Sequence, residues 1–142
     1  MPMGRGVTQT FRCRAETVPR VRAMVTAELR RNGAVEDLVD RVVLATAEAC
    51  NNAILHSQSP SYVVGIDIGD DTCVVTVRDA GVGFAVPDRM EMPEPDAVSR
   101  RGLALMCVLV DEVCVSSNGV GTTVELRQML VGADESVAVL SH

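Results

Sequence analysis

The sequence predicts an α+β fold of two layers, with the helices on one face of a mostly antiparallel sheet. The first observation is size and composition: 142 residues, 47% apolar and 23% charged, are typical of one globular domain. The second is periodicity, because five short segments have strand character and three have helical spacing. The third is their order: one strand, two helices, a hairpin, a long loop, a helix and a second hairpin.

The first segment, residues 7–14, alternates loosely between two sides and predicts an edge strand. A helix is expected from Thr17, two residues before Pro19, because apolar residues then recur at helical spacing. Asn32-Gly33 is a good left-handed cap and should end this helix. A second, longer helix is expected over residues 35–57, where small and apolar residues follow one side.

The next two segments, residues 62–68 and 72–78, predict a hairpin closed by the turn at residues 69–71. A loop follows over residues 79–98 and is rich in Gly, Pro, Asp and Glu. Loops of this length in small domains are usually functional lids or disordered segments.

The last elements are a short apolar helix over residues 102–109 and a final hairpin that turns at Asn118-Gly119. The hairpin strands are expected at residues 113–117 and 120–129. Residues 7–129 are therefore predicted to form one domain, and residues 130–142 a C-terminal tail.

The basic residues narrow the possible chemistry, because all 13 of them are Arg. Without Lys the chain has no P-loop lysine and no Schiff-base lysine. A nucleotide enzyme built on this chain must neutralise phosphates with backbone amides, Arg and a metal. The net charge of −6 and an aromatic content of 2% disfavour direct nucleic-acid binding.

The composition also predicts where the protein is located and whether its cysteines are reduced. The chain contains no run of 18 apolar residues and no apolar signal-peptide core at its start, so no membrane association and a cytoplasmic location are expected. The five cysteines are odd in number and lack C-x-x-C spacing, so we expect small buried hydrophobes in a reducing compartment. Two histidines exclude a multi-histidine metal site within this chain.

The first candidate motif lies on the long helix, where Glu48, Asn52 and His56 are spaced four apart and share one face. An amide oxygen beside a carboxylate suits a hard ion such as Mg²⁺ and a neighbouring general base. A solvated polar stripe is the structural alternative.

The second motif, Asp79-Ala80-Gly81-Val82-Gly83, directly follows a predicted strand. Its two glycines allow the backbone to approach a flat ligand closely, and Asp79 can accept a hydrogen bond from an amine. A common Asp/Gly turn is the alternative. The dinucleotide fingerprint is excluded, because it needs a third glycine and a following helix.

Two further motifs lie in the C-terminal part. In residues 99–106 a glycine opens the predicted helix, so free amides, the helix dipole and Arg can hold a phosphate. The alternative is a solvated Arg pair ahead of a core helix. Residues 121–126, Gly-Thr-Thr-Val-Glu-Leu, lie in the final hairpin and are by themselves compatible with a plain hairpin.

Together, in this order, the four motifs resemble the GHKL, or Bergerat, ATP-binding domain. The resemblance covers Phe11 to Arg127 and is strongest to the stand-alone bacterial anti-sigma-factor serine kinases. It implies that Asn52 coordinates the Mg²⁺ of bound ATP, that Glu48 is the general base and that Asp79 accepts a hydrogen bond from the adenine amine. The other implied nucleotide-binding residues are Gly81, Gly83, Arg101, Gly102, Leu103 and Thr123.

The same resemblance implies a function. The protein would phosphorylate a serine of an anti-anti-sigma partner, sequester a sigma factor and form a homodimer, with the N-terminal strand and the next helix as the expected surface. The family box Gly-Arg-Gly-Leu reads Arg100-Arg101-Gly102-Leu103 here, and a side chain at position 100 would be strained if the position required positive φ. A non-catalytic partner-binding module is therefore the alternative. The ATPase half of a histidine kinase is disfavoured, because His56 lies inside the ATP helix.

Overall fold

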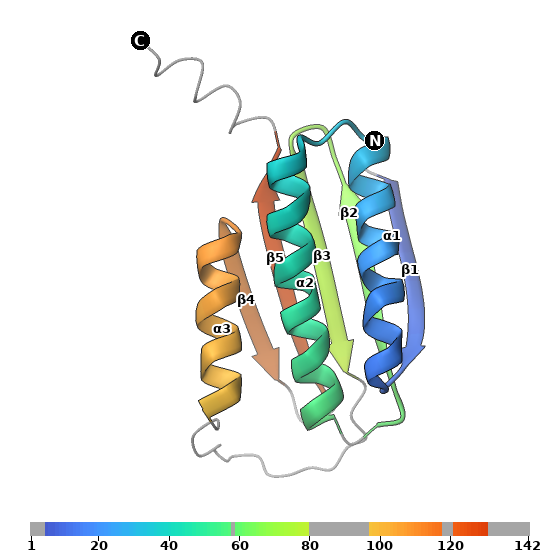
Figure 1. Ribbon diagram of the computed structural model, residues 1–142, viewed down its shortest axis with the longest axis vertical. Coiled ribbons are helices and arrows are strands. Elements are labelled where there is room, and N and C mark those ends of the chain that lie inside the picture. Colours follow the sequence, from blue (N-terminus) through green and yellow to red (C-terminus); the bar gives the residue numbers. More distant parts are fainter. Residues whose placement is uncertain (1–4, 58, 80–96, 118–120, 131–142) are drawn as a thin grey trace.

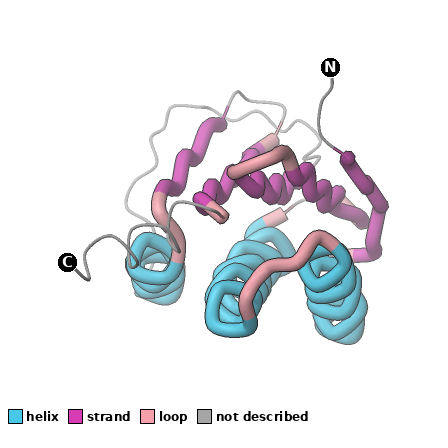
Figure 2. The backbone as a smooth tube through the Cα atoms, turned by 90° about the horizontal axis from the view of Figure 1, so that it is seen from above, coloured by secondary structure: helices cyan, strands magenta, loops and turns pink. Residues whose placement is uncertain are grey.

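The computed structural model describes residues 5–57, 59–79, 97–117 and 121–130. In this part of the chain, three helices cover one face of a five-stranded sheet, which confirms the predicted fold class (Figures 1 and 2). The strand order is β1-β2-β3-β5-β4, and each neighbouring pair is antiparallel. The elements are β1 (Arg5–Arg12), η1 (Ala15–Thr17), α1 (Val18–Arg31), α2 (Glu36–His56), β2 (Ser61–Ile68), β3 (Thr72–Asp79), α3 (Ala97–Leu109), β4 (Glu112–Ser117) and β5 (Thr122–Met129).

The first strand and helix largely follow the prediction. β1 is an edge strand of the sheet, as expected. The helix begins as a short 3₁₀ turn that ends at Thr17 and continues as α1, with Pro19 in its first turn, where the missing N–H costs nothing. Thr17 is the N-cap residue of α1, but its side chain makes no capping hydrogen bond, and its hydroxyl lies 2.7 Å from the hydroxyl of Tyr62. Gly33 ends the helix with a φ of 79°, as a left-handed cap requires.

The core lies between the helices and one face of the sheet. In β2 and β3 buried residues alternate with more exposed ones, which is the two-residue period of a sheet covered on one face. The core is built mainly of Val, Leu, Ile and Ala. Its aromatic contact joins Phe11 and Tyr62, whose ring centroids are 5.8 Å apart.

The opposite face of the sheet is not covered by helices (Figure 2). It has a shallow hollow of about 320 Å³ that is lined in part by Gly6, Thr8, Gly65 and Thr76. A side chain at position 65 would bring its Cβ within 3.3 Å of the Thr8 hydroxyl oxygen. Because Gly65 has no side chain, this part of the hollow remains unfilled.

The cysteines differ from the expectation of uniform burial. Cys50 and Cys73 are buried, and burial raises the pKa of each thiol to about 12, so both remain protonated. Cys13 is half-buried. The prediction is wrong for Cys107 and Cys114, which are exposed because they lie on the solvent side of α3 and on the edge strand β4.

Several expectations fall on residues that are not described. They are most of the loop predicted over residues 79–98, the turn at residues 118–119 and the tail after residue 130. Leu130 packs against the core, and its amide donates to the Asp71 carbonyl at 2.8 Å. None of the helices in the described residues is long and apolar enough to span a bilayer.

Candidate functional site

The candidate site is built on the C-terminal half of α2. Glu48 and Asn52 lie one helical turn apart, and both side chains are half-buried. The residues between them include Ala49 and Cys50, which face the core and are buried. Asn51 is exposed. The helix thus presents a carboxylate and an amide side by side at the margin of the core.

The inner side of α3 meets these two residues at Gly102. A Cβ placed on Gly102 would lie 3.2 Å from Asn52 Nδ2 and 3.5 Å from Glu48 Oε1. The first distance is tighter than ordinary contact, so a side chain here would force Asn52 or the helix to move. The structure therefore brings three residues of two separate sequence motifs together, and it shows why glycine stands at position 102.

The predicted start of this helix is wrong. α3 begins at Ala97, so Gly102 is its sixth residue and lies inside the helix. Its amide is within the helical hydrogen-bonding pattern, whereas only the first four N–H groups of a helix are free. Gly102 therefore does not offer a free amide to phosphate. A signal for the earlier start is present in the sequence, because Asp96 precedes Ala97 and Asp is a favoured N-cap residue.

The helical backbone also answers the concern about position 100. Arg100 lies within α3, where φ is negative, so no left-handed conformation is required of it. Arg101 and Leu103 are exposed beside the buried Gly102. The side chain of Arg101 is therefore accessible from solvent.

Asp79 is the last residue of β3 and is only 9% exposed. Burial raises the pKa of its carboxyl group, while a hydrogen bond with Ser57 and the nearby charge of His56 lower it, and the net shift is upward. Ser57 directly follows α2, so Asp79 lies at the C-terminal end of this helix. No sequence motif marks Ser57, because only the packing of α2 against β3 brings it to Asp79.

The fourth motif lies at the start of β5, in the final hairpin as predicted. Thr123 pairs with Arg78 across β5 and β3, whereas Thr122 pairs with Asp79. Directly paired residues lie on the same face of a sheet, and successive residues alternate. The structure therefore brings Thr122, and not Thr123, to the face that carries Asp79. Gly81 and Gly83 lie outside the described residues.

The residues present fit a divalent ion that takes most of its ligands from elsewhere. Within the described ranges no group of three His, Cys, Asp or Glu side chains can hold a metal. Asn52 offers one amide oxygen, and Mg²⁺ commonly takes one or two protein ligands, with phosphate oxygens and water completing its shell. This donor set matches an ion that arrives with a nucleotide.

A comparison with protein families decides the assignment. The sequence profile of the histidine kinase-like ATPase domain matches residues 11–128. This chain belongs to the histidine kinase-like ATPase family. The match spans α2, α3 and the end of β3, so it includes every described part of the candidate site.

Individual relatives within the family are similar over most of their length. The anti-sigma F factor of Geobacillus stearothermophilus is 32% identical over 130 residues, covering 83% of this chain and 88% of that protein. The serine-protein kinase RsbW of Bacillus velezensis is 31% identical over 130 residues, covering 82% of this chain and 81% of that protein. These relatives confirm the resemblance to the anti-sigma-factor serine kinases.

Solved structures confirm the fold. The RsbU and RsbW domains of a Mycobacterium tuberculosis protein superpose with a TM-score of 0.68 at 22% identity, covering 88% of this chain and 32% of the longer one. The histidine kinase domain of a blue-light-activated kinase from Erythrobacter litoralis gives a TM-score of 0.52 at 23% identity, covering 90% of this chain and 65% of that one. The chain described here therefore matches about a third of the length of the Mycobacterium tuberculosis protein.

Proposed function

We propose that this protein is an ATP-dependent protein-serine kinase that acts as an anti-sigma factor. The observation that carries the proposal is the meeting of Glu48 and Asn52 on α2 with Gly102 on α3. A carboxylate, an amide and the bare backbone of a glycine meet there, and we assign the carboxylate the role of general base and the amide that of metal ligand. The names of the relatives, an anti-sigma F factor and a serine-protein kinase, support the same function.

Residues from several elements around this point would each contact a different part of the nucleotide. Asn52 would hold Mg²⁺, which supplies charge neutralisation for the phosphates when bound. Arg101 on α3 would add a charge-assisted contact to phosphate, which suits a chain whose basic residues are all Arg. Asp79, buried at the end of β3, would accept a hydrogen bond from the adenine amine, with Thr122 on the same face. Gly81, Gly83, Leu103 and Thr123 remain predicted contacts.

The transfer step assigns one role to Glu48. The hydroxyl oxygen of a partner serine attacks the γ-phosphorus of ATP, and the bond from this phosphorus to the bridging oxygen breaks. ADP leaves with the electron pair of that bond. The carboxylate of Glu48 accepts the hydroxyl proton, so charge and atoms balance.

The regulatory partners follow from the same proposal. The phosphate acceptor would be a serine of an anti-anti-sigma protein, and the sequestered protein would be a sigma factor, both in the cytoplasm. A homodimer with β1 and α1 at its surface is also proposed, because β1 is an edge strand. Light scattering of the purified protein tests the dimer directly.

The non-catalytic alternative is not favoured. It rested on Arg100, and this position lies in regular helix without a requirement for positive φ. Relatives with the names of an anti-sigma factor and a serine kinase are 31% to 32% identical over most of the chain. A module that merely binds partners has no need for a carboxylate one turn from the amide of Asn52.

Calorimetric titration with ATP, with and without Mg²⁺, tests the site. Asn52→Ala should abolish the Mg²⁺-dependent part of binding, because it removes the amide ligand. Asn51→Ala is the matched control: the neighbouring asparagine is exposed on the same helix and should bind like the wild type. Equal losses in both variants, or no binding by the wild type, would contradict the proposal.

A further inference from the structure

The C-terminal end of α3 is tied to α2 by Arg41. Its Nη1 donates to the carbonyl oxygen of Leu109, the last residue of α3, at 3.0 Å. The same nitrogen lies 3.5 Å from Oε1 of Gln128 on β5. Its Nε donates to Asp37 Oδ2 at 3.1 Å, one turn earlier on α2. One guanidinium thus joins α2, α3 and β5.

Gln128 continues this network into the core. It is only 3% exposed, and its Oε1 accepts a hydrogen bond from the Asp111 amide at 3.2 Å. Its Nε2 donates to Asp111 Oδ2 at 3.2 Å. The same carboxylate oxygen accepts from the Met129 amide at 2.9 Å. Because a buried amide side chain needs its partners, this network resists displacement. We name Arg41, Asp111 and Gln128 the clasp.

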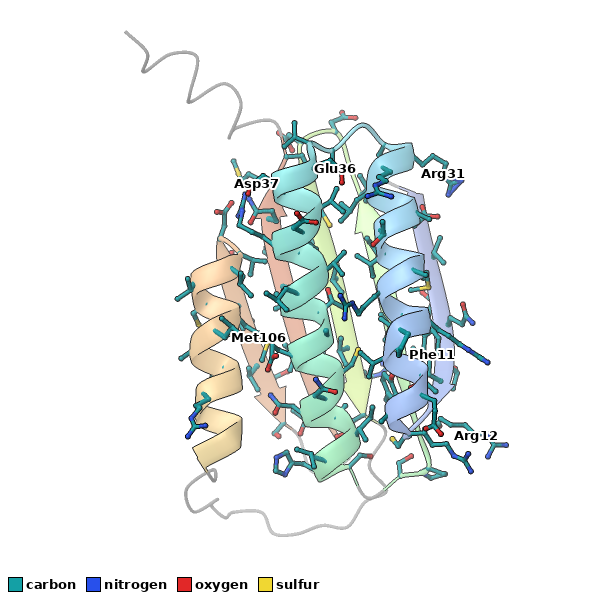
Figure 3. The ribbon with its side chains drawn as sticks, in the orientation of Figure 1. Phe11, Arg12, Arg31, Glu36, Asp37 and Met106 are labelled. Atoms are coloured by element: carbon teal, nitrogen blue, oxygen red, sulfur yellow. The ribbon has the colours of Figure 1, made fainter. Side chains whose placement is uncertain are left out.

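Between the clasp and Gly102, α3 packs against the rest of the protein with its inner side. Met106 is buried, and Figure 3 shows it directed from α3 toward α2. One turn farther from the clasp, Gly102 meets Asn52 and Glu48. The outer side of α3 is exposed at Leu103, Leu105, Cys107 and Val108. The polar contacts of α3 described above thus lie at its C-terminal end, and the candidate site lies beside its other half.

We propose that Arg41 is a positioning residue of the nucleotide site. It holds the C-terminal end of α3 so that Gly102 remains against Asn52 and Glu48. Leu109 and Gly102 are seven residues apart, or about 10 Å along a helix, so a small tilt at the clasp moves the helix at Gly102. The part of this inference that concerns ATP rests on the proposed function.

The chemistry of arginine suits this position. The planar group directs separate N–H donors toward Asp37 and toward the Leu109 carbonyl. Lysine offers a single nitrogen at the end of a flexible chain. Arg41→Lys should therefore keep the charge but weaken the hold on α3.

A double-mutant cycle between Arg41 and Gly102 tests the proposal. Gly102→Ala introduces a methyl group that meets Asn52 Nδ2, and a firmly held α3 cannot yield to it. Releasing the clasp with Arg41→Ala lets the helix move away. Gly102→Ala lowers the affinity for Mg²⁺-ATP by one factor in the wild type and by another in the Arg41→Ala background. The second factor should be smaller than the first by about fivefold or more. Equal losses in both backgrounds would overturn the proposal.

Arg30→Ala is the matched control for this cycle. Arg30 also makes two hydrogen bonds, to Glu36, but it lies on α1 and is exposed. Its removal should leave the effect of Gly102→Ala unchanged. Coupling of equal size in this background would mean that general destabilisation, and not the clasp, moves the site, and would also overturn the proposal.

The same cycle measured by urea unfolding without nucleotide separates this inference from the proposed function. Gly102→Ala should destabilise the wild type more than it destabilises Arg41→Ala, and additive effects would count against the clasp. If the wild type fails to bind Mg²⁺-ATP, the proposed function fails, and the unfolding cycle still decides the role of Arg41. Arg41→Lys replaces Arg41→Ala in both cycles if the alanine variant does not fold, with the same direction expected.

Discussion

The two ends of α3 are held in different ways. Its C-terminal end is fixed by the clasp, in which the buried Gln128 and the side chain of Asp111 satisfy each other and two backbone amides. Its other half approaches α2 through the absence of a side chain at Gly102. One end is secured by polar contacts that favour a single arrangement, whereas the other packs closely against Glu48 and Asn52 because Gly102 has no side chain. The contacts that anchor α3 and the proposed nucleotide site therefore lie at different positions along this one helix.

The largest effect is expected from Glu48→Gln. This change removes the proposed base but keeps the size of the side chain, so phosphate transfer from ATP to a serine partner should fall about a hundredfold or more. Mg²⁺-dependent ATP binding should remain, because Asn52 is intact. Transfer of labelled γ-phosphate to a purified anti-anti-sigma protein measures the first quantity, and calorimetry the second.

Glu36→Gln is the control for this prediction. Glu36 is the first residue of α2 (Figure 3), is exposed and paired with Arg30, and lies about three helical turns before Glu48. Its loss should leave transfer unchanged. If transfer by Glu48→Gln equals that of the wild type, Glu48 is not the base.

The next effect concerns the attachment of α3 to the core. Met106 is 1% exposed, and truncation to Ala should lower the free energy of unfolding by about 2–5 kcal/mol through lost burial and a new cavity. Its neighbour Leu105 is 37% exposed, so Leu105→Ala should cost much less. Urea denaturation of the two variants measures the difference. Similar losses would mean that the inner side of α3 is not what attaches it between the clasp and Gly102.

The smallest effect is expected from Asp79→Asn and depends on pH. Burial raises the folded-state pKa of Asp79 above its unfolded value, so its contribution to stability is fully present below the unfolded pKa of about 4 and is lost as pH rises through the folded value. The charged form is thus the costly one at neutral pH. Asp79→Asn should gain stability relative to the wild type at pH 7, and the gain should disappear toward pH 4.

Thermal unfolding at several pH values measures this difference. Asp70→Asn, in the exposed turn between β2 and β3, should show no such trend. A loss of stability in Asp79→Asn at pH 7 that persists at pH 4 would show that the hydrogen bond with Ser57, and not the cost of charge, dominates at this position.

Particular elements show how far the sequence predicts this molecule. The cap at Gly33 and the β2–β3 hairpin were predictable because a left-handed glycine and a short turn act within a few residues. The start of α3 was missed, since the glycine of Arg101-Gly102 resembles a helix opening. It lies inside a helix because its missing side chain permits packing against α2. The pairing of Thr122 with Asp79 was not predictable, because a shift of one residue exchanges the two faces of a strand.

The sequence by itself determined that Glu48 and Asn52 share one side of a helix, because the helical period is a local property of the backbone. It also determined that the core is aliphatic, because aromatic residues are scarce. Catalysis by a lysine side chain is excluded, because the chain has no Lys. Only the tertiary structure decided that Gly102 meets these two residues, that Ser57 reaches Asp79 and that Arg41 holds Leu109. These contacts join segments distant in the chain, and their geometry depends on how helices pack against one another and on the sheet.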